Sequence, residues 1–144
     1  MKIKWGVIGA GGIADRRTIP GMMLADNAEL VAVMEINMEL AEKIRAKYNA
    51  ARAYDNVDDI LADKDIDAVY IASPVTTHKE QAIKAAKAKK HILLEKPLTL
   101  ASEDGWEIVK VCKEEGVLLA TGFMMRYHAY HQKMKEIVQS GKLG

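Results

Sequence analysis

The feature that most constrains the fold of this sequence is a regular alternation of short apolar runs with longer segments of helical periodicity. Six short runs of strand length, most of them apolar almost throughout, lie at residues 3–9, 30–34, 51–54, 67–72, 91–94 and 117–121. Strands with apolar side chains on both faces are typical of parallel sheets covered by helices. We therefore predict an α/β fold in which six strands form a doubly wound parallel sheet with helices on both faces.

The segments between and after these runs repeat apolar residues at the spacing of a helix. The expected helices lie at residues 11–24, 38–48, 57–61, 79–90, 102–115 and 127–139. The fourth helix is rich in alanine and lysine, and its lysines are expected to form a solvated face. In a doubly wound sheet, ligands bind beyond the carboxyl ends of the strands. Candidate functional residues are therefore sought at that edge.

Composition excludes several classes of protein. The 144 residues carry 21 Lys+Arg and 20 Asp+Glu, and a net charge of +1 argues against nucleic acid as a partner. A single cysteine, Cys112, rules out an internal disulfide and suits a cytoplasmic location. The apolar runs are too short for a membrane span, and the N-terminal residues leave no room for a signal peptide. We expect one cytoplasmic domain with no membrane contact.

A glycine turn follows the first predicted strand and fits the pattern G-x-G-x-x-G/A. Gly9 permits the tight turn, Gly11 lets the backbone approach a pyrophosphate, and Ala14 lets the helix pack closely on the strand. Gly12 and Ile13 complete the start of the helix, where free N–H groups favour phosphate. With a strand before it and a helix after it, this turn predicts a Rossmann-like dinucleotide-binding site.

An acidic residue ends the second strand. Glu35 follows the glycine turn by about 20 residues, the spacing at which an acid accepts hydrogen bonds from the adenosine ribose of NAD. The 2′-phosphate of NADP would meet this carboxylate, and the next residues, Ile36 and Asn37, supply no positive charge. We predict NAD rather than NADP, a preference that would change if Arg16 or Arg17 reached the phosphates.

Two further motifs follow the fourth and fifth strands: A-S-P-V-T-T-H at residues 72–78 and E-K-P at residues 95–97. With the glycine turn, in this order and spacing, the sequence resembles the Gfo/Idh/MocA oxidoreductases, the group containing glucose-fructose oxidoreductase and inositol dehydrogenase. Residues 121–128 also look like the family's segment after the sixth strand. The resemblance covers essentially the whole chain.

The resemblance implies roles for the residues of these motifs. Ser73, Pro74 and Thr76 match the loop that lies along the dinucleotide, and His78 matches a histidine that helps seat it. The activity implied is hydride transfer between a sugar or polyol hydroxyl and a nicotinamide cofactor.

The same resemblance implies which residues surround the reacting end of the cofactor. Glu95 matches the acid near the nicotinamide ribose. Lys96 matches the lysine that contacts the substrate hydroxyl and assists proton transfer, and Arg126 matches a position near the nicotinamide and the substrate. No metal site is expected, because no acid or cysteine joins His128 and His131.

Members of the family carry a second domain that supplies the substrate pocket. Residues 1–144 match only the dinucleotide-binding domain, so we expect the substrate domain to be absent and catalysis by this chain alone to be incomplete. The alternative is a non-catalytic, stand-alone NAD(H)-binding module or fragment. A surface near residues 123–134 would then be uncovered, which predicts a homo-oligomer or a mobile tail.

Overall fold

A computed structural model describes residues 2–144, and within them six strands form one parallel sheet. The strands are β1 (Ile3–Ile8), β2 (Ala28–Met34), β3 (Arg52–Tyr54), β4 (Ala68–Ile71), β5 (His91–Leu94) and β6 (Leu119–Thr121). Their order is β3-β2-β1-β4-β5-β6, so successive strands are added toward one edge of the sheet from β1 to β3 and toward the other edge from β4 to β6. The predicted doubly wound, Rossmann-like sheet is confirmed, and its switch point lies between β1 and β4.

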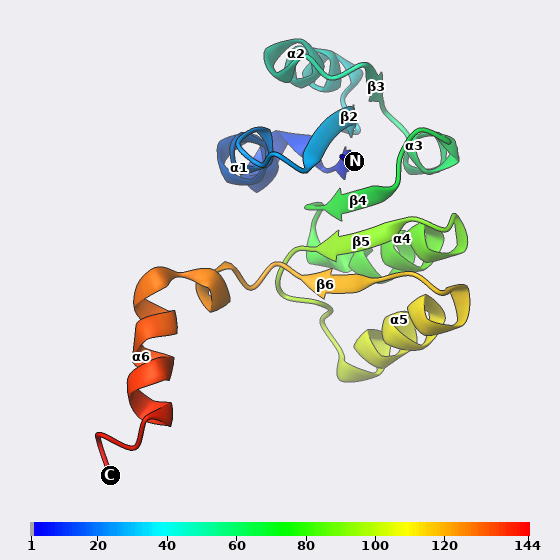
Figure 1. The fold of residues 1–144 in the computed structure, drawn as a ribbon. Coiled ribbons are helices and arrows are strands. Elements are labelled where there is room, and N and C mark those ends of the chain that lie inside the picture. Colours follow the sequence, from blue (N-terminus) through cyan, green and yellow to red (C-terminus); the bar gives the residue numbers. More distant parts are fainter. Residues whose placement is uncertain (1) are drawn as a thin grey trace.

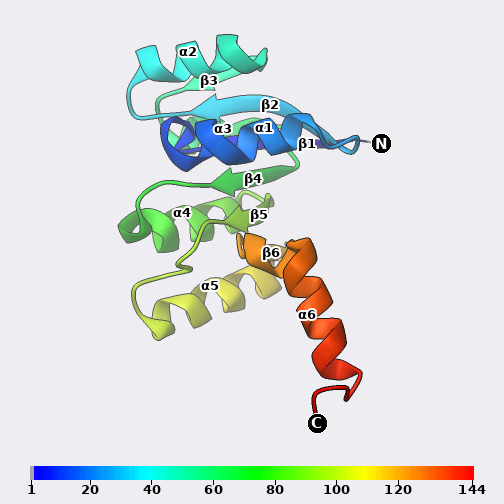
Figure 2. The ribbon, with the colours of Figure 1, turned by 90° about the vertical axis from the view of Figure 1, so that its left-hand side faces the viewer.

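Helices cover both faces of this sheet (Figures 1 and 2). The helical segments are η1 (Ala10–Thr18), α1 (Ile19–Met23), α2 (Met38–Tyr48), α3 (Val57–Ala62), α4 (Val75–Lys87), α5 (Ser102–Glu115), η2 (Met124–Tyr127) and α6 (Ala129–Gln139). In Figure 1, η1, α1 and α2 lie on one side of the sheet, and α3, α4 and α5 lie on the other. None of the helices in the described part of the chain is long and apolar enough to cross a membrane.

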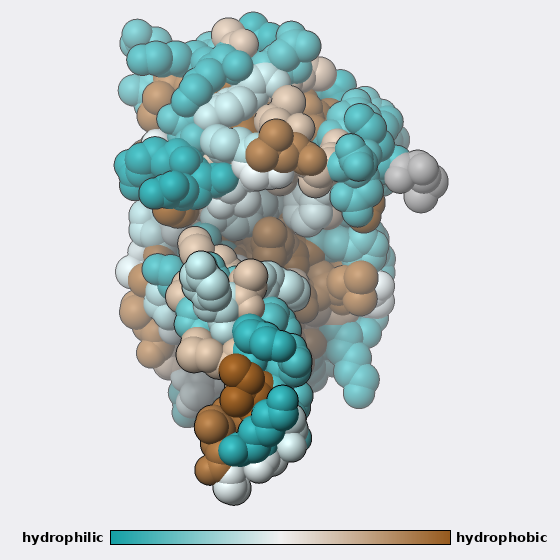
Figure 3. Space-filling model, turned by 60° about the vertical axis from the view of Figure 1, so that its left-hand side comes forward, coloured by the Kyte–Doolittle hydropathy of each residue, from teal (hydrophilic) through white to brown (hydrophobic). Residues whose placement is uncertain are grey.

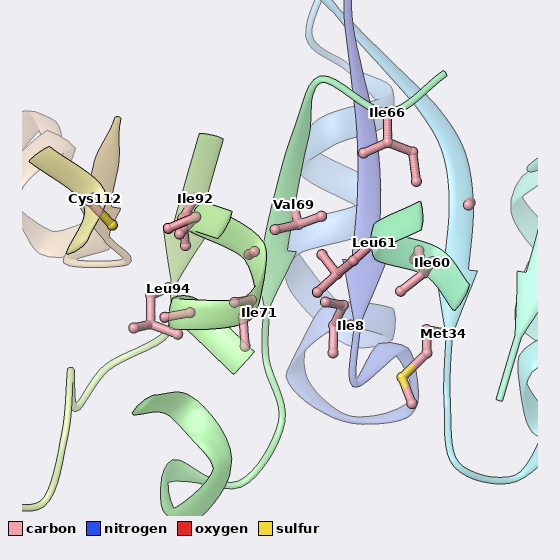
Figure 4. Packing of buried hydrophobic residues seen from close by; sticks show 14 of the residues in the cluster. Ile8, Met34, Ile60, Leu61, Ile66, Val69, Ile71, Ile92, Leu94 and Cys112 are labelled. Atoms are coloured by element: carbon pink, nitrogen blue, oxygen red, sulfur yellow. The ribbon is translucent and has the colours of Figure 1, made fainter. Parts of the chain in front are cut away.

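The alternation of side chains along each strand divides the core into two layers. Ile8 and Ile71 belong to a buried cluster with residues of α3, α4 and α5, where Cys112 also lies (Figure 4). Their neighbours Val7 and Tyr70 belong to a second cluster with residues of η1, α1 and α2. The sheet is therefore apolar on both sides, as the near-continuous apolar runs predicted.

The first helix differs from the single helix expected at residues 11–24. Its first part, η1, is wound as a π-helix and is interrupted at Gly12, whose φ of −98° and ψ of −117° are not helical. A separate short helix, α1, then begins with Pro20 in its first turn. Glycine permits the unusual backbone, and proline favours a fresh helix start. The helical pattern of the sequence could not reveal the break.

The lysines of the fourth helix are not a simple solvated face. The helix begins at Val75, earlier than expected, and Lys79 forms ion pairs with Asp104 and Glu107 of α5. Lys90 lies beyond the end of the helix and is buried. Its Nζ donates to the carbonyls of Asp63 at 2.7 Å and Ile66 at 2.8 Å, which compensates for the loss of water. Burial lowers the pKa of Lys90. The prediction of a solvated face was wrong for Lys90, whose position is decided by tertiary partners, whereas Lys87 and Lys89 are exposed as expected.

The C-terminal segment projects away from the sheet (Figure 1). Helix α6 contains no buried residue, and most of its apolar side chains are exposed along with those before it, including Phe123, Met124, Met134 and Val138. Figure 3 shows apolar side chains gathered along this protruding segment. The uncovered surface expected near residues 123–134 is present. Self-association through it stays a prediction.

Candidate functional site

The glycine turn follows β1 and packs against the ends of β2 and β4. Gly9 adopts the left-handed conformation, with a φ of 78°, and its N–H donates to the carbonyl of Met34 at 3.0 Å. A Cβ at residue 9 would lie 2.6 Å from the backbone nitrogen of Ser73. Only glycine fits here, because both the φ angle and the close approach of another backbone exclude a side chain. The expected tight turn is confirmed.

Glu35 is held directly on this turn. Its Oε2 accepts a hydrogen bond from the Gly11 N–H at 2.9 Å, and its Oε1 accepts one from the Ile36 N–H at 3.0 Å. A Cβ at residue 11 would lie 2.8 Å from Leu40 Cδ2 and 3.0 Å from Glu35 Oε2. Gly11 thus allows the carboxylate of β2 to reach the turn that follows β1.

The remaining residues of the turn face in two directions. Ala14 is fully buried in the core layer of η1, which confirms the close packing of helix on strand. Ile13 is half-buried, and a Cβ at Gly12 would meet no atom within 4 Å. The turn therefore packs tightly against the core at Ala14 and leaves free space beside Gly12.

A groove of about 500 Å³ opens at the switch point of the sheet. It is bordered by residues from the ends of β1, β2 and β4 and from α4: Ile8, Gly9, Gly12, Met34, Glu35, Ile36, Ala72, Ser73, Pro74, Thr77 and Gln81. Among these described lining residues none is basic. A concave groove at this position is where open α/β sheets bind their ligands. The structure thus brings the glycine turn, Glu35 and the Ser73–Pro74 loop together.

The groove also contains two residues, Thr77 and Gln81, that were not predicted to be part of the site. Thr76 is exposed and lies outside the lining, whereas Thr77 and Gln81 line it. The Ser73 hydroxyl donates to Gln81 Oε1 at 2.5 Å, and the Thr77 hydroxyl lies 2.9 Å from Ser73 Oγ. Thr77 and Gln81 are four residues apart on α4, so they share one helix face. The four-residue spacing of Thr77 and Gln81 is the feature of the sequence that could have indicated their shared position in the groove.

His78 lies behind the groove and links two loops. Its side chain is 1% exposed, with Nε2 at 3.0 Å from the carbonyl of Ser73 and Nδ1 at 3.0 Å from the carbonyl of Pro97. The imidazole therefore connects the loop after β4 with the loop after β5. Any effect of His78 on a ligand would pass through the positions of these loops.

Glu95, at the end of β5, is held by a residue that sequence reasoning missed. The Tyr70 hydroxyl donates to Glu95 Oε1 at 2.7 Å, and the Lys96 N–H donates to Glu95 Oε2 at 2.9 Å. Burial raises the pKa of the Tyr70 phenol well above its usual range, and the neighbouring Glu95 raises it further. The Lys96 side chain is exposed at the edge of the sheet.

A second, smaller hollow of about 240 Å³ lies beside Glu95. Its lining comes from η1, β4, β5, β6 and the segment after β6: Thr18, Tyr70, Leu93, Glu95, Ala120, Thr121, Gly122, Phe123, Met124 and Tyr127. Arg126 lies in η2, outside the lining of both hollows. The two hollows place one carboxylate, Glu35, on the β2 side of the switch point and the other, Glu95, on the β5 side.

A parallel sheet with a glycine turn and a strand-end acid at its switch point defines a nucleotide-binding domain of the Rossmann class. The chain belongs to the Gfo/Idh/MocA oxidoreductases: residues 3–123 match this family, described as "Oxidoreductase family, NAD-binding Rossmann fold". It is the NAD(P)-binding domain of that family, as the resemblance implied.

Similar proteins include both reductases and dehydrogenases. The chain is 34% identical over 141 residues to the 1,5-anhydro-D-fructose reductase of Ensifer adhaerens, covering 98% of this chain and 42% of that protein. A scyllo-inositol dehydrogenase of Lactobacillus casei, solved with NAD(H) and scyllo-inositol, is 27% identical with a TM-score of 0.93, covering 100% of this chain and 43% of that one.

A third relative was solved with a different cofactor. A 3-ketoreductase of Actinomadura kijaniata, in complex with NADP and TDP-benzene, is 30% identical with a TM-score of 0.92, covering 98% of this chain and 43% of that one. Related structures thus hold either NAD(H) or NADP. The chain spans less than half the length of the relatives it matches.

Proposed function

We propose that this chain is the NAD(H)-binding domain of an oxidoreductase that transfers a hydride between a sugar or polyol hydroxyl and the nicotinamide. The observation that carries the proposal is the Glu35 carboxylate, fixed by two backbone N–H groups at the edge of the larger groove. When bound, the dinucleotide supplies the hydride acceptor or donor, and the protein supplies position and proton transfer.

The residues present at the groove fit the adenosine half of NAD. Each Glu35 oxygen accepts one hydrogen bond from the backbone, which leaves further lone pairs for ribose hydroxyl donors. Gly12 offers backbone without a side chain where the first helix starts, a place suited to phosphate. A 2′-phosphate would bring negative charge beside Glu35 with no basic partner among the described lining residues. These features support NAD over NADP.

The nicotinamide half is assigned to the β5 side of the switch point. Glu95 would accept from the nicotinamide ribose, and the loop after β4, through Ser73, Pro74 and Thr77, would run along the dinucleotide between the two carboxylates. Lys96 stands next to Glu95 with its side chain exposed, where it can contact a substrate hydroxyl and assist transfer of its proton.

The proposed substrate class is supported by the relatives, which are named as an anhydrofructose reductase, a scyllo-inositol dehydrogenase and a 3-ketoreductase. A second candidate function is a stand-alone NAD(H)-binding module without turnover. Such a module would need the groove and Glu35 but not the exposed Lys96 side chain. The two candidates differ in one measurement, since only the enzyme oxidises or reduces a sugar or polyol when NAD(H) is bound.

Calorimetric titration of this chain with NAD, NADH and NADPH at one ionic strength tests the proposal. We expect NAD and NADH to bind more tightly than NADPH. A chain that bound none of the three would refute the dinucleotide site. Tighter binding of NADPH than of NADH would refute the role given to Glu35 while leaving the family's cofactor class intact.

Glu35→Ala sharpens this test. Losing the charged acceptor of the ribose hydroxyls should weaken NADH by about ten- to a hundredfold, since one such hydrogen bond contributes about 1.5–3 kcal/mol. NADPH should change less, because the substitution also removes repulsion of its 2′-phosphate. Glu39→Ala is the matched control, since Glu39 is an exposed acid of the nearby helix α2 outside the groove lining. Equal losses for NADH and NADPH would contradict the ribose role.

A further inference from the structure

Three residues from separate elements form a chain of side-chain hydrogen bonds beneath the smaller hollow. The Thr18 hydroxyl, at the end of η1, lies 3.0 Å from the Tyr70 oxygen, and the Tyr70 hydroxyl lies 2.7 Å from Glu95 Oε1. Glu95 Oε2 in turn accepts the Lys96 N–H at 2.9 Å. The first helix is thereby connected through β4 to the loop after β5.

The direction of these hydrogen bonds is fixed by chemistry. An ionised carboxylate only accepts, so the single phenolic hydrogen of Tyr70 must go to Glu95. The Tyr70 oxygen is then free to accept, and Thr18 is the donor to it. Tyr70 is 1% exposed, so its hydroxyl is shielded from water and depends on these two partners.

The Glu95 carboxylate is therefore fixed by a hydrogen bond from the buried side chain of Tyr70. Hydrogen bonds to a charged group are short and strong, and the one from Tyr70 occupies one Glu95 oxygen while the Lys96 N–H occupies the other. The remaining lone pairs of the Glu95 oxygens can accept hydrogen bonds from a ligand in the smaller hollow. A Cβ at Gly122 would lie 3.4 Å from Glu95 Oε1, so a glycine keeps that side of the carboxylate clear.

We propose that Tyr70 is a positioning residue for the nicotinamide end of the cofactor. Its buried hydroxyl, aligned by Thr18, fixes the Glu95 carboxylate so that it can accept from the ribose and keeps the backbone of Lys96 in place. This rests on the proposed function, in which Glu95 meets the nicotinamide ribose. Groups that bind ligands act best when a second set of contacts fixes them, and Tyr70 provides that contact from within the core.

The test is Tyr70→Phe, which keeps the ring and removes the hydroxyl. We expect NADH to bind about five- to tenfold more weakly, which is less than the loss of a whole hydrogen bond to a charged group, because the Glu95 contact to the ribose is loosened and not removed. ADP, which occupies only the adenosine half near Glu35, should bind as it does to the wild-type chain. A general loosening of the fold would weaken both ligands, so the contrast separates positioning from structure.

Tyr54→Phe is the matched control. Its hydroxyl also donates to a carboxylate, Asp63 Oδ2 at 3.1 Å, but Tyr54 lines neither hollow. It should leave both NADH and ADP affinities unchanged. In a Glu95→Gln background, Tyr70→Phe should add little further loss, because the two residues act on one contact.

The outcomes are distinguishable. If the wild-type chain binds neither ADP nor NADH, the proposed function fails and the role of Tyr70 fails with it. If the wild-type chain binds NADH and Tyr70→Phe binds it equally well, or loses ADP and NADH alike, only the positioning role is overturned. Should Tyr70→Phe not fold, Thr18→Val removes the donor to Tyr70. An NADH affinity unchanged in that variant would then overturn the proposal.

Discussion

Gly9→Ala is expected to be among the most destabilising single-methyl additions to this chain. The residue has a φ of 78°, which alanine tolerates poorly. The added Cβ would also lie 2.6 Å from Ser73 N, 2.8 Å from Ala72 C and 2.9 Å from Ser73 Cα. All three atoms belong to the backbone of the loop after β4, so no side chain can swing aside to relieve the contact.

The magnitude follows from two contributions. A left-handed alanine costs about 1–2 kcal/mol. The three contacts are more than half an ångström shorter than the optimal separation of about 3.5 Å, and forcing such overlap in a packed region costs about 1–3 kcal/mol more. Together they predict a loss of about 2–5 kcal/mol, a large fraction of a typical stability of about 5–15 kcal/mol.

Urea unfolding followed by far-UV circular dichroism measures this loss, with Gly116→Ala as the control. Gly116 ends α5 with a φ of 70°, but its added Cβ would meet nothing within 4 Å. The control should therefore show only the conformational part, about 1–2 kcal/mol. If Gly9→Ala were no less stable than Gly116→Ala, the close approach of the two backbones would be refuted.

Two further changes test other parts of the molecule. Burial disfavours the charge on Asp63, yet hydrogen bonds from the Asp65 N–H, Tyr54 and Arg52 lower the pKa of its carboxyl overall. The ionised carboxylate therefore stabilises the folded chain fully above the unfolded-state pKa, and this stabilisation is lost as the pH falls through the lower folded-state pKa. Asp63→Asn should cost about 2 kcal/mol at pH 7 and progressively less below about pH 4, measured by urea unfolding across pH; a deficit that stayed constant with pH would refute this linkage. Lys96→Met should raise the affinity for NAD relative to NADH about threefold to fivefold by calorimetry, because an ammonium group beside the positive nicotinamide repels it. An unchanged ratio of NAD to NADH affinity would show that the Lys96 ammonium group does not lie near the nicotinamide ring.

Much of the fold could be predicted from local patterns. Hydrophobic runs and helical periodicity placed the strands and most helices, because an element that is buried on one or both faces has apolar residues at a regular spacing in the sequence. Helix α2 and strand β5 were predicted to the residue. The break at Gly12 was not foreseen, since a glycine in a helical pattern signals permissiveness and no particular backbone angle.

The site was predicted in part, for a related reason. Motifs indicated Gly9, Glu35 and Glu95, and parallel strands bring their carboxyl ends to one edge of the sheet. Tyr70, by contrast, reads in the sequence as one more apolar residue of a buried strand. Its hydroxyl gained a role only because β4 and β5 are neighbours, which brings Glu95 within hydrogen-bond distance although it lies 25 residues away.

The sequence by itself determined the class of fold, the edge where a ligand site is expected and the family to which the chain belongs, because periodicity and short motifs are local properties. Only the tertiary structure decided which polar groups meet: Glu35 with the Gly11 N–H, His78 with two loop carbonyls, and Tyr70 with Glu95. Such contacts depend on which strands are adjacent and which face each side chain takes. Those are properties of the whole packed sheet rather than of any one segment.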